Sequence, residues 1–193
     1  MPYATSSNFT RRRLYDTNVC LLRPAVARAV AAANREIMST GHKLKMWDCY
    51  RPRHISLLMW RIGEEHNRAC RAQGRACLKS GCDPSRSNCL WEPLNIFVSR
   101  RSKHNQGAAV DATLVDIFGR EVAMGTLYDH FGPKARTRNA TGRAAKNRAL
   151  LKAVMRKYGF RNYYREWWHY DHDTAPRYAP LDILISEAAH SAH

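Results

Sequence analysis

Two short segments that lie far apart in the chain have to meet in space if their residues act together, and this requirement constrains the fold more than any other feature. The first segment, Ser102–Asp111, contains His104 and Asp111, and the second is Glu166–His169. Two imidazoles and one carboxylate give Zn²⁺ three protein ligands and leave the fourth tetrahedral position open, as in catalytic zinc sites. We therefore predict one zinc ion per chain, held by His104, Asp111 and His169.

The spacing within each segment decides where these side chains point. His104 and Asp111 are seven positions apart, so a loop has to fold His104 back over a strand that carries Asp111, and Gly107 permits such a turn. Glu166 and His169 are three positions apart, and a regular strand would point them to opposite faces. We expect Glu166 just before the strand or on a bulge, facing a water molecule at the fourth zinc position without binding the metal.

Each of these residues also has an ordinary structural interpretation. A lone histidine in a loop is usually a surface residue, and a lone aspartate in a strand usually marks an edge or a turn. Their combination with the distant Glu-x-x-His is what favours a metal site. Two imidazoles and a carboxylate suit several divalent metals, so zinc itself is an inference from this set. Trp167 and Trp168 have two compatible interpretations: they pack in the core, and they exclude water from the surroundings of Glu166.

Amide hydrolysis at such a site needs a base and a cation. Zinc lowers the pKa of its bound water to about 7, and a nearby carboxylate takes the proton as the water attacks a carbonyl, the role that we predict for Glu166. The carbonyl oxygen then becomes an oxyanion. Arg51 follows a predicted strand and is our candidate for stabilising that charge, with a plain surface arginine as the alternative.

The periodicity of the apolar residues predicts which segments form helices and which form strands. Spacings of three and four residues indicate helices, and alternation indicates strands. We expect helices over residues 24–40, 52–65 and 141–158, and strands over residues 43–50, 109–115 and 167–170. A chain of 193 residues fits a single domain over residues 1–193, with a polar, Cys-rich insertion at about residues 67–93.

The chain carries 32 Lys and Arg against 16 Asp and Glu, a formal net charge of +16. Such a charge attracts polyanions, so nucleic acid, anionic cell-wall polymers and acidic lipid surfaces all come into question. The basic residues are scattered instead of forming one tract with interleaved aromatics, which argues against nucleic acid as the functional ligand. We expect a solvated basic surface, with anionic cell-wall polymers as candidate partners. No apolar run approaches the roughly 18 residues of a membrane span.

Four of the six cysteines lie close together in the predicted insertion: Cys70, Cys77, Cys82 and Cys89. Their spacing fits neither a zinc ribbon nor a redox pair and favours two local disulfides, with a second zinc site or free thiols as alternatives. Cys20 and Cys49 stand in apolar surroundings, and we expect them to be small buried residues. The cysteine cluster favours a periplasmic or secreted protein, although no signal peptide is visible, and a cytoplasmic location is the alternative.

Three motifs together carry a resemblance to a known family. They are Asp-x-Tyr-Arg-Pro at residues 48–52, Ser-x-His-x-x-Gly-x-Ala-x-Asp at residues 102–111 and Glu-Trp-Trp-His at residues 166–169. In these motifs the chain resembles the D-alanyl-D-alanine metallopeptidases related to the vancomycin-resistance enzymes. The two tryptophans after the glutamate make it more similar to the dipeptidase branch than to the carboxypeptidase branch, and the resemblance extends over nearly the whole chain.

The resemblance implies the α+β fold of these D-Ala-D-Ala metallopeptidases, also called the hedgehog/DD-peptidase fold, in which helices pack on a small, mainly antiparallel sheet. It implies the zinc ligands already named, with Glu166 as general base and Arg51 as the group that stabilises the transition state. It further implies that Asp129 and Tyr3 hold the ammonium group of the substrate, that Ser102 helps to orient the dipeptide and that Trp168 contacts it. A carboxylate for an ammonium makes physical sense, because a dipeptidase has to recognise a free amino end.

The implied activity is zinc-dependent hydrolysis of free D-alanyl-D-alanine, in peptidoglycan precursor turnover or glycopeptide resistance. A first alternative is a D,D-carboxypeptidase or an L-alanyl-D-glutamate endopeptidase that acts on longer cell-wall peptides. A second alternative is a zinc-binding module without catalytic activity. The presence of Glu166 and Arg51 argues against this second alternative.

Overall fold

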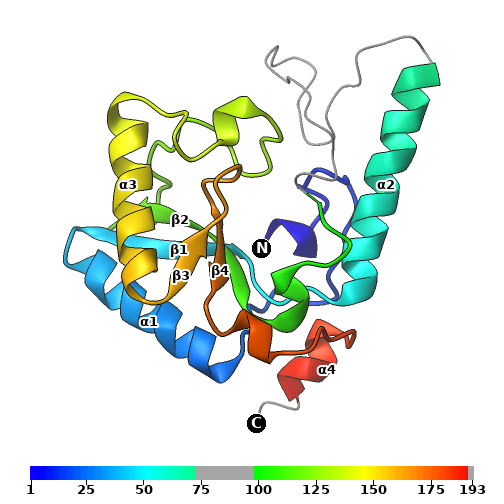
Figure 1. Ribbon diagram of the computed structural model, residues 1–193, viewed down its shortest axis with the longest axis horizontal. Helices are drawn as coiled ribbons and strands as arrows, with labels where there is room; N and C mark the ends of the chain where they lie inside the picture. The colour runs from blue at the N-terminus through cyan, green and yellow to red at the C-terminus, as the bar shows by residue number, and fades with distance from the viewer. Residues whose placement is uncertain (73–97, 191–193) are drawn as a thin grey trace.

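A four-stranded antiparallel sheet forms the centre of the computed structural model, which describes residues 1–72 and 98–190 (Figure 1). The strand order is β1-β2-β4-β3, and each neighbouring pair is antiparallel. The strands are β1 (His42–Asp48), β2 (Ala109–Asp116), β3 (Phe160–Asn162) and β4 (His169–His172). This arrangement, with helices around it, confirms the predicted α+β class.

Two helices cover one side of the sheet, and a third stands apart from them across the molecule (Figure 1). The first two are α1 (Pro24–Met38) and α3 (Gly142–Lys157), and the third is α2 (Arg53–Ala72). The described residues also form α4 (Ile185–His190) and the 3-10 turns η1 (Pro2–Ala4), η3 (Lys103–Gln106), η4 (Pro133–Ala135) and η5 (Ala175–Arg177). Helix α1 begins at a proline, which has no N–H to leave unpaired at a helix start.

The apolar residues gather in two clusters, one on each side of the central strand. The first cluster packs α1 and α3 against the sheet and includes Ile37 and Leu151. The second cluster packs the N-terminal segment against α2 and includes Tyr15 and Met59. Because both sides are covered, the first seven residues of β2 are all buried, and a functional group on β2 lies in a dry environment.

The bounds of the predicted elements agree with the structure to within two residues except at three places. Helix α2 continues to Ala72, beyond the predicted end at residue 65, and so enters the segment assigned to the Cys-rich insertion. Most of that segment, with Cys77, Cys82 and Cys89, lies outside the described residues, and its disulfides stay a prediction. The short elements β3 and α4 were not predicted, because three strand residues and six helical residues are too few to show a clear period.

The prediction for Cys20 and Cys49 as small buried residues is wrong, because the two form a disulfide with their Cα atoms 5.3 Å apart. Cys49 is fully buried, whereas Cys20 is exposed. An apolar sequence context does not reveal which two cysteines the fold brings together, since pairing depends on Cα separation and Cβ direction. The disulfide ties the N-terminal segment to the end of β1.

Within residues 1–72 and 98–190, the helices are either too short or too polar for any of them to cross a membrane.

Candidate active site

The register of three neighbouring strands places three polar residues in one row across the sheet. Asp111 on β2 lies directly opposite His169 on β4, and it also pairs with Asp48 on β1. The pairing of β1 shifts between Met46 and Asp48, so Trp47 forms a bulge there. Without that extra residue, Asp48 would fall out of line with Asp111, since a shift of one position turns a side chain to the other face.

His104 reaches the same place from the 3-10 turn η3, which precedes β2. The turn is capped by Ser102, whose side chain accepts a hydrogen bond from the His104 N–H, and it ends at Gly107 in the left-handed conformation with φ 64°. The carbonyl of His104 accepts a hydrogen bond from the Arg51 N–H, which joins the turn to the end of β1. The loop predicted over Asp111 is therefore present.

Three ligand atoms converge in a small triangle at this place. His104 Nε2 lies 3.2 Å from Asp111 Oδ1 and 3.1 Å from His169 Nδ1, and His169 Nδ1 lies 2.9 Å from Asp111 Oδ1. Tetrahedral zinc with bonds of about 2.0–2.1 Å separates its ligand atoms by roughly 3.3 Å, close to these distances. Within the described ranges, these three residues form the group that could hold a metal ion.

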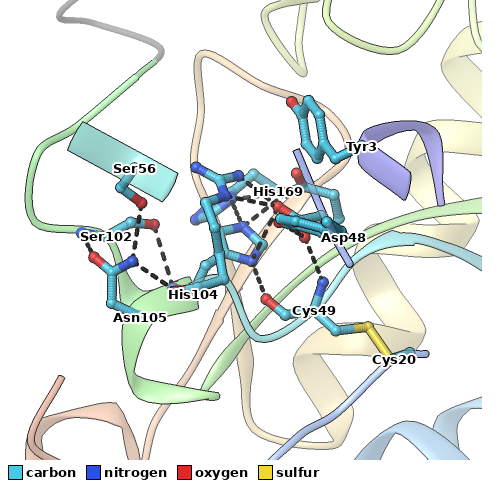
Figure 2. A network of polar contacts seen from close by, with 12 residues as sticks. Tyr3, Cys20, Asp48, Cys49, Ser56, Ser102, His104, Asn105 and His169 are labelled. Carbon is cyan, nitrogen blue, oxygen red and sulfur yellow. Dashed lines mark hydrogen bonds and ion pairs between the residues drawn. A yellow bond between two sulfur atoms is a disulfide. The ribbon is translucent and has the colours of Figure 1, made fainter. Parts of the chain in front are cut away.

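The partners of the outer ring nitrogens show how two neutral imidazoles would direct their lone pairs into the triangle. His104 Nδ1 lies 2.6 Å from the carbonyl oxygen of Cys49, and His169 Nε2 lies 3.1 Å from Asp171 Oδ1. Both contacts place the ring proton on the outer nitrogen, as the partners of metal-binding histidines usually do. The inner nitrogens then face Asp111 Oδ1 with lone pairs only. Such a donor set fits a divalent cation (Figure 2).

The second oxygen of Asp111 is held by Tyr128, whose hydroxyl donates a hydrogen bond of 2.7 Å to Oδ2. The Tyr128 ring packs between Trp47 and Trp168, with ring centroids 4.6 Å and 5.5 Å away. Burial opposes ionisation of Asp111, but when no metal is bound the charged forms of His104 and His169 outweigh burial and hold the pKa of this carboxyl well below its usual range. Asp111 is therefore a carboxylate with one oxygen free for a metal.

Glu166 lies in the turn just before β4, as predicted, and not on the strand itself. Its Oε2 is 3.9 Å from His169 Nδ1, so the carboxylate borders the triangle without being part of it. Trp167 and Trp168 are almost completely buried beside it. Burial raises the pKa of the Glu166 carboxyl well above its usual range, and nearby His169 offsets this shift in part.

Arg51 is held in place by a buried ion pair. Its guanidinium contacts Asp48 Oδ2 through Nε at 3.0 Å and through Nη2 at 2.5 Å. The Asp48 carboxylate also accepts hydrogen bonds from the Tyr15 hydroxyl at 2.6 Å and from the Cys49 N–H at 2.9 Å. Arg51 lines the same pocket as Glu166, so the structure brings the predicted base and the predicted cation together.

A pocket of about 350 Å³ opens over the triangle. All four residues expected to contact a substrate, Tyr3, Ser102, Asp129 and Trp168, line it. The Tyr3 hydroxyl donates a hydrogen bond of 2.8 Å to Asp129 Oδ2. Burial raises the pKa of the Asp129 carboxyl well above its usual range, and the bond from Tyr3 counteracts that shift only in part. Ser102 has a structural task as well, because it caps η3.

Sequence reasoning missed the residues that orient the three candidate ligands. Asp171 could have been found, because it stands two positions after His169 on a strand and therefore points to the same face. The Tyr128 hydroxyl and the Cys49 carbonyl carry no sequence signal, since their partners are distant in the chain. The ligand and catalytic roles of the nine predicted site residues stay predictions, although the structure places all nine around one pocket.

Comparisons with known proteins agree with this site. The family model described as D-ala-D-ala dipeptidase, peptidase M15, matches residues 1–188. The D-alanyl-D-alanine dipeptidase of Enterococcus faecalis is 31% identical over 177 residues, covering 87% of this chain and 82% of that protein. The enzyme of the same name from Escherichia coli is 27% identical over 183 residues, covering 94% and 81%. That from Streptomyces coelicolor is 31% identical over 175 residues, covering 87% and 82%.

Two solved structures also align with the chain. One is a variant of the vancomycin resistance D,D-pentapeptidase VanY in complex with Zn(II), with a TM-score of 0.48, 16% identity and coverage of 84% of this chain and 80% of that chain. The other is VanYB in complex with D-Alanine-D-Alanine, with a TM-score of 0.44, 13% identity and coverage of 92% of each chain. The sequence matches confirm the resemblance seen in the motifs, and the chain belongs to the D-ala-D-ala dipeptidase family, peptidase M15.

Proposed function

We propose that this protein hydrolyses free D-alanyl-D-alanine to D-alanine with one zinc ion per chain. The observation that carries the proposal is the triangle of lone pairs formed by His104, Asp111 and His169, which lies under a pocket that also contains Glu166 and Arg51. The relatives named D-alanyl-D-alanine dipeptidase support this substrate. The pocket volume of about 350 Å³ suits a small ligand, because it lies at the lower end of the volumes of known ligand-binding pockets.

When bound, zinc supplies a Lewis acid that polarises a peptide carbonyl and makes a water molecule more acidic. Glu166 takes the proton from the attacking water and then passes it to the leaving amine. Its raised pKa suits both tasks, because a carboxylate in a dry site accepts a proton readily. Arg51 places a buried cation beside the oxyanion that forms on the carbonyl.

Asp129 and Tyr3 hold the ammonium group of the dipeptide. Burial disfavours the charged form of the Asp129 carboxyl, and a bound ammonium would restore it. The ligand that binds most favourably is therefore one that brings a positive charge within hydrogen-bond reach of Asp129. Ser102 lines the same pocket as an orienting group, and the Trp168 ring forms an apolar contact surface for a small side chain.

Three measurements test the activity. The first compares turnover of D-Ala-D-Ala with that of a pentapeptide precursor, and we expect the dipeptide to be the better substrate. Preference for the pentapeptide would establish the carboxypeptidase or endopeptidase alternative.

The second measurement adds a chelator, which should abolish hydrolysis, and then zinc, which should restore it. The third is Glu166→Ala, expected to retain bound zinc and lose turnover. A variant that stays active would contradict the role of Glu166 as the base, whereas a natural protein that binds zinc and hydrolyses nothing would establish the zinc-binding module.

We infer further that the protein works in a periplasmic or secreted setting, in precursor turnover or glycopeptide resistance, with anionic cell-wall polymers as partners. The Cys20–Cys49 disulfide supports such a location, because disulfides persist in oxidising compartments. The net charge of +16 supports the partners. Fractionation of the native host tests the location, and recovery of the active protein only from the cytosol would contradict it.

A further inference from the structure

The stretch between Asp129 and Glu166 contains eleven basic residues and no acidic residue. The structure folds this stretch into η4, α3 and β3, so its charges lie on neighbouring parts of one region. The basic residues are Lys134, Arg136, Arg138, Arg143, Lys146, Arg148, Lys152, Arg156, Lys157, Arg161 and Arg165. One third of the 32 basic residues of the chain therefore belongs to a segment without any carboxylate of its own.

A second hollow, separate from the active-site pocket, opens within this region. It has a volume of about 590 Å³ and lies between α3 and the preceding loop. Its lining includes the cationic side chains of Arg138, Arg148 and Lys152 and no aspartate or glutamate. An exposed tyrosine, Tyr164, forms another part of the wall. Three positive charges around one hollow repel one another, and an anion between them would relieve that repulsion.

Arg148 is a buried guanidinium without a counter-charge. Only 2% of it is exposed, and it donates hydrogen bonds to the carbonyl oxygens of Met124, Arg136 and Lys134 at 2.7, 2.8 and 3.1 Å. In the parts of the chain that the structure describes, no carboxylate lies within ion-pair distance of Arg148. Burial accordingly lowers its pKa to about 10. The carbonyls satisfy donors, but they do not neutralise the charge.

Arg138 and Lys152 are exposed at the rim of the hollow, and within residues 1–72 and 98–190 neither forms an ion pair. Other basic residues of the region differ in this respect. Lys157 pairs with Glu36 at 2.6 Å, and Arg161 pairs with Asp173 at 2.6 Å. Among the described residues, no carboxylate therefore neutralises the three positive charges that line the hollow.

We propose that this hollow binds a phosphate group of a phosphodiester polymer of the cell envelope. Arginine presents a planar set of donors that matches phosphate oxygens, and lysine adds a point charge. Exposed basic residues continue along α3 on either side of the hollow, at Arg143 and Arg156, so a repeating anion would find further contacts. The Cys20–Cys49 disulfide favours a polyanion of an oxidising compartment over nucleic acid.

The position of the hollow relative to the active site fits this role. Tyr163 lines the active-site pocket and its neighbour Tyr164 lines the hollow, so the loop before β4 separates the two. The carbonyl of Tyr164 accepts a hydrogen bond of 3.0 Å from the N–H of Thr137, which also lines the hollow. A polymer bound there would retain the protein on an anionic surface and leave the catalytic pocket open.

The test measures binding of a fluorescently labelled poly(glycerol phosphate) fragment by anisotropy in 150 mM salt, a concentration at which weak surface attraction is largely screened (about 8 Å Debye length). The site variant is Arg138→Ala with Lys152→Ala. The matched control is Arg28→Ala with Lys43→Ala, which removes the same charge from exposed positions on α1 and β1. Arg148 stays unchanged, because its hydrogen bonds hold the fold together.

We expect the site variant to lose affinity at least tenfold and the control less than twofold. Equal losses in both, or no binding by the natural protein, would overturn the proposal. Competition with poly-glutamate and with single-stranded DNA identifies the chemistry. Displacement by poly-glutamate as effective as by the phosphate polymer, or tighter binding of DNA, would also overturn it. Because the readout is binding and not hydrolysis, the result stands independently of the dipeptidase activity.

Discussion

Arg51 and Asp48 form a buried ion pair at the end of β1, with Arg51 Nη2 2.5 Å from Asp48 Oδ2 and the aspartate side chain fully buried. The pair fixes the guanidinium in the wall of the active-site pocket. Asp48 is itself held by Tyr15 and by the Cys49 N–H, so it is a rigid support. Its carboxylate therefore acts through Arg51 and not on a substrate.

The variant Asp48→Asn should reduce both stability and turnover. Removing one partner of a buried ion pair costs about 3–5 kcal/mol, because the other charge stays buried. A displaced Arg51 should lower kcat by about 10²-fold, as the loss of an oxyanion donor does, with a smaller change in KM. Urea denaturation and steady-state kinetics measure the two effects. The control is Asp116→Asn, which removes the charge of the partly buried partner of the exposed Arg120. Similar kinetics for both variants would show that Asp48 does not position Arg51.

The variant Tyr128→Phe should weaken metal binding without removing a ligand. Its hydroxyl orients Asp111 through the 2.7 Å bond to Oδ2. Partners of this kind contribute about 10–100-fold to metal affinity. Zinc affinity measured by competition with a chelator tests this. Tyr158→Phe serves as the control, because it removes a hydroxyl bound to Glu36 far from the pocket. Unchanged affinity in Tyr128→Phe would contradict an orienting role for this hydroxyl.

The variant Cys20→Ser should destabilise the fold and loosen the metal site. The disulfide closes a loop with a sequence separation of 29, and a loop of this length is worth about 3.5 kcal/mol in the chain-entropy model. The carbonyl of Cys49 also accepts the proton of His104 Nδ1, so a looser Cys49 should lower zinc affinity (Figure 2).

Chemical denaturation and zinc titration measure both consequences of opening the disulfide. Val19→Ala, at the neighbouring exposed position, controls for a change of side chain in this segment. If Cys20→Ser lost stability but bound zinc like the natural protein, the disulfide would serve the fold alone.

The contact between α1 and α3 should weaken in acid through Glu36. Hydrogen bonds from Lys157 and Tyr158 lower the pKa of the Glu36 carboxyl below its ordinary value of 4.5. Because the folded pKa is the lower one, the stabilisation is present above pH 4.5 and is lost as the pH falls through the folded value.

Melting temperatures of the natural protein and of Glu36→Gln, followed from neutral to acidic pH, test this effect. The natural protein should melt higher at neutral pH, and the difference should shrink as the carboxylate is protonated. A difference that stays constant with pH would mean that the charge of Glu36 contributes nothing.

Local patterns were sufficient for much of this protein. The alternation around Asp111 and the helical spacing after Pro24 depend on neighbours along the chain, and the structure contains the expected strand and helix. The argument that Glu166 cannot share a strand face with His169 follows from strand geometry alone, and Glu166 does lie before β4. The motifs identified the family, and the α+β class followed from that resemblance.

Contacts between distant segments needed the tertiary structure. The bulge at Trp47 aligns Asp48 with Asp111, and no property of the β1 sequence shows where a pairing register will shift. The Cys20–Cys49 disulfide was missed for the same reason, since pairing depends on the separation of two backbones in space.

The sequence by itself determined which chemical groups are available: two imidazoles, three carboxylates and an arginine, on loops and strand ends that permit a site. Only the tertiary structure decided how these groups are oriented. It directs His104 through the Cys49 carbonyl, His169 through Asp171 and Asp111 through Tyr128. A hydrogen bond depends on distance and angle within tenths of an ångström, and positions along a chain do not specify these.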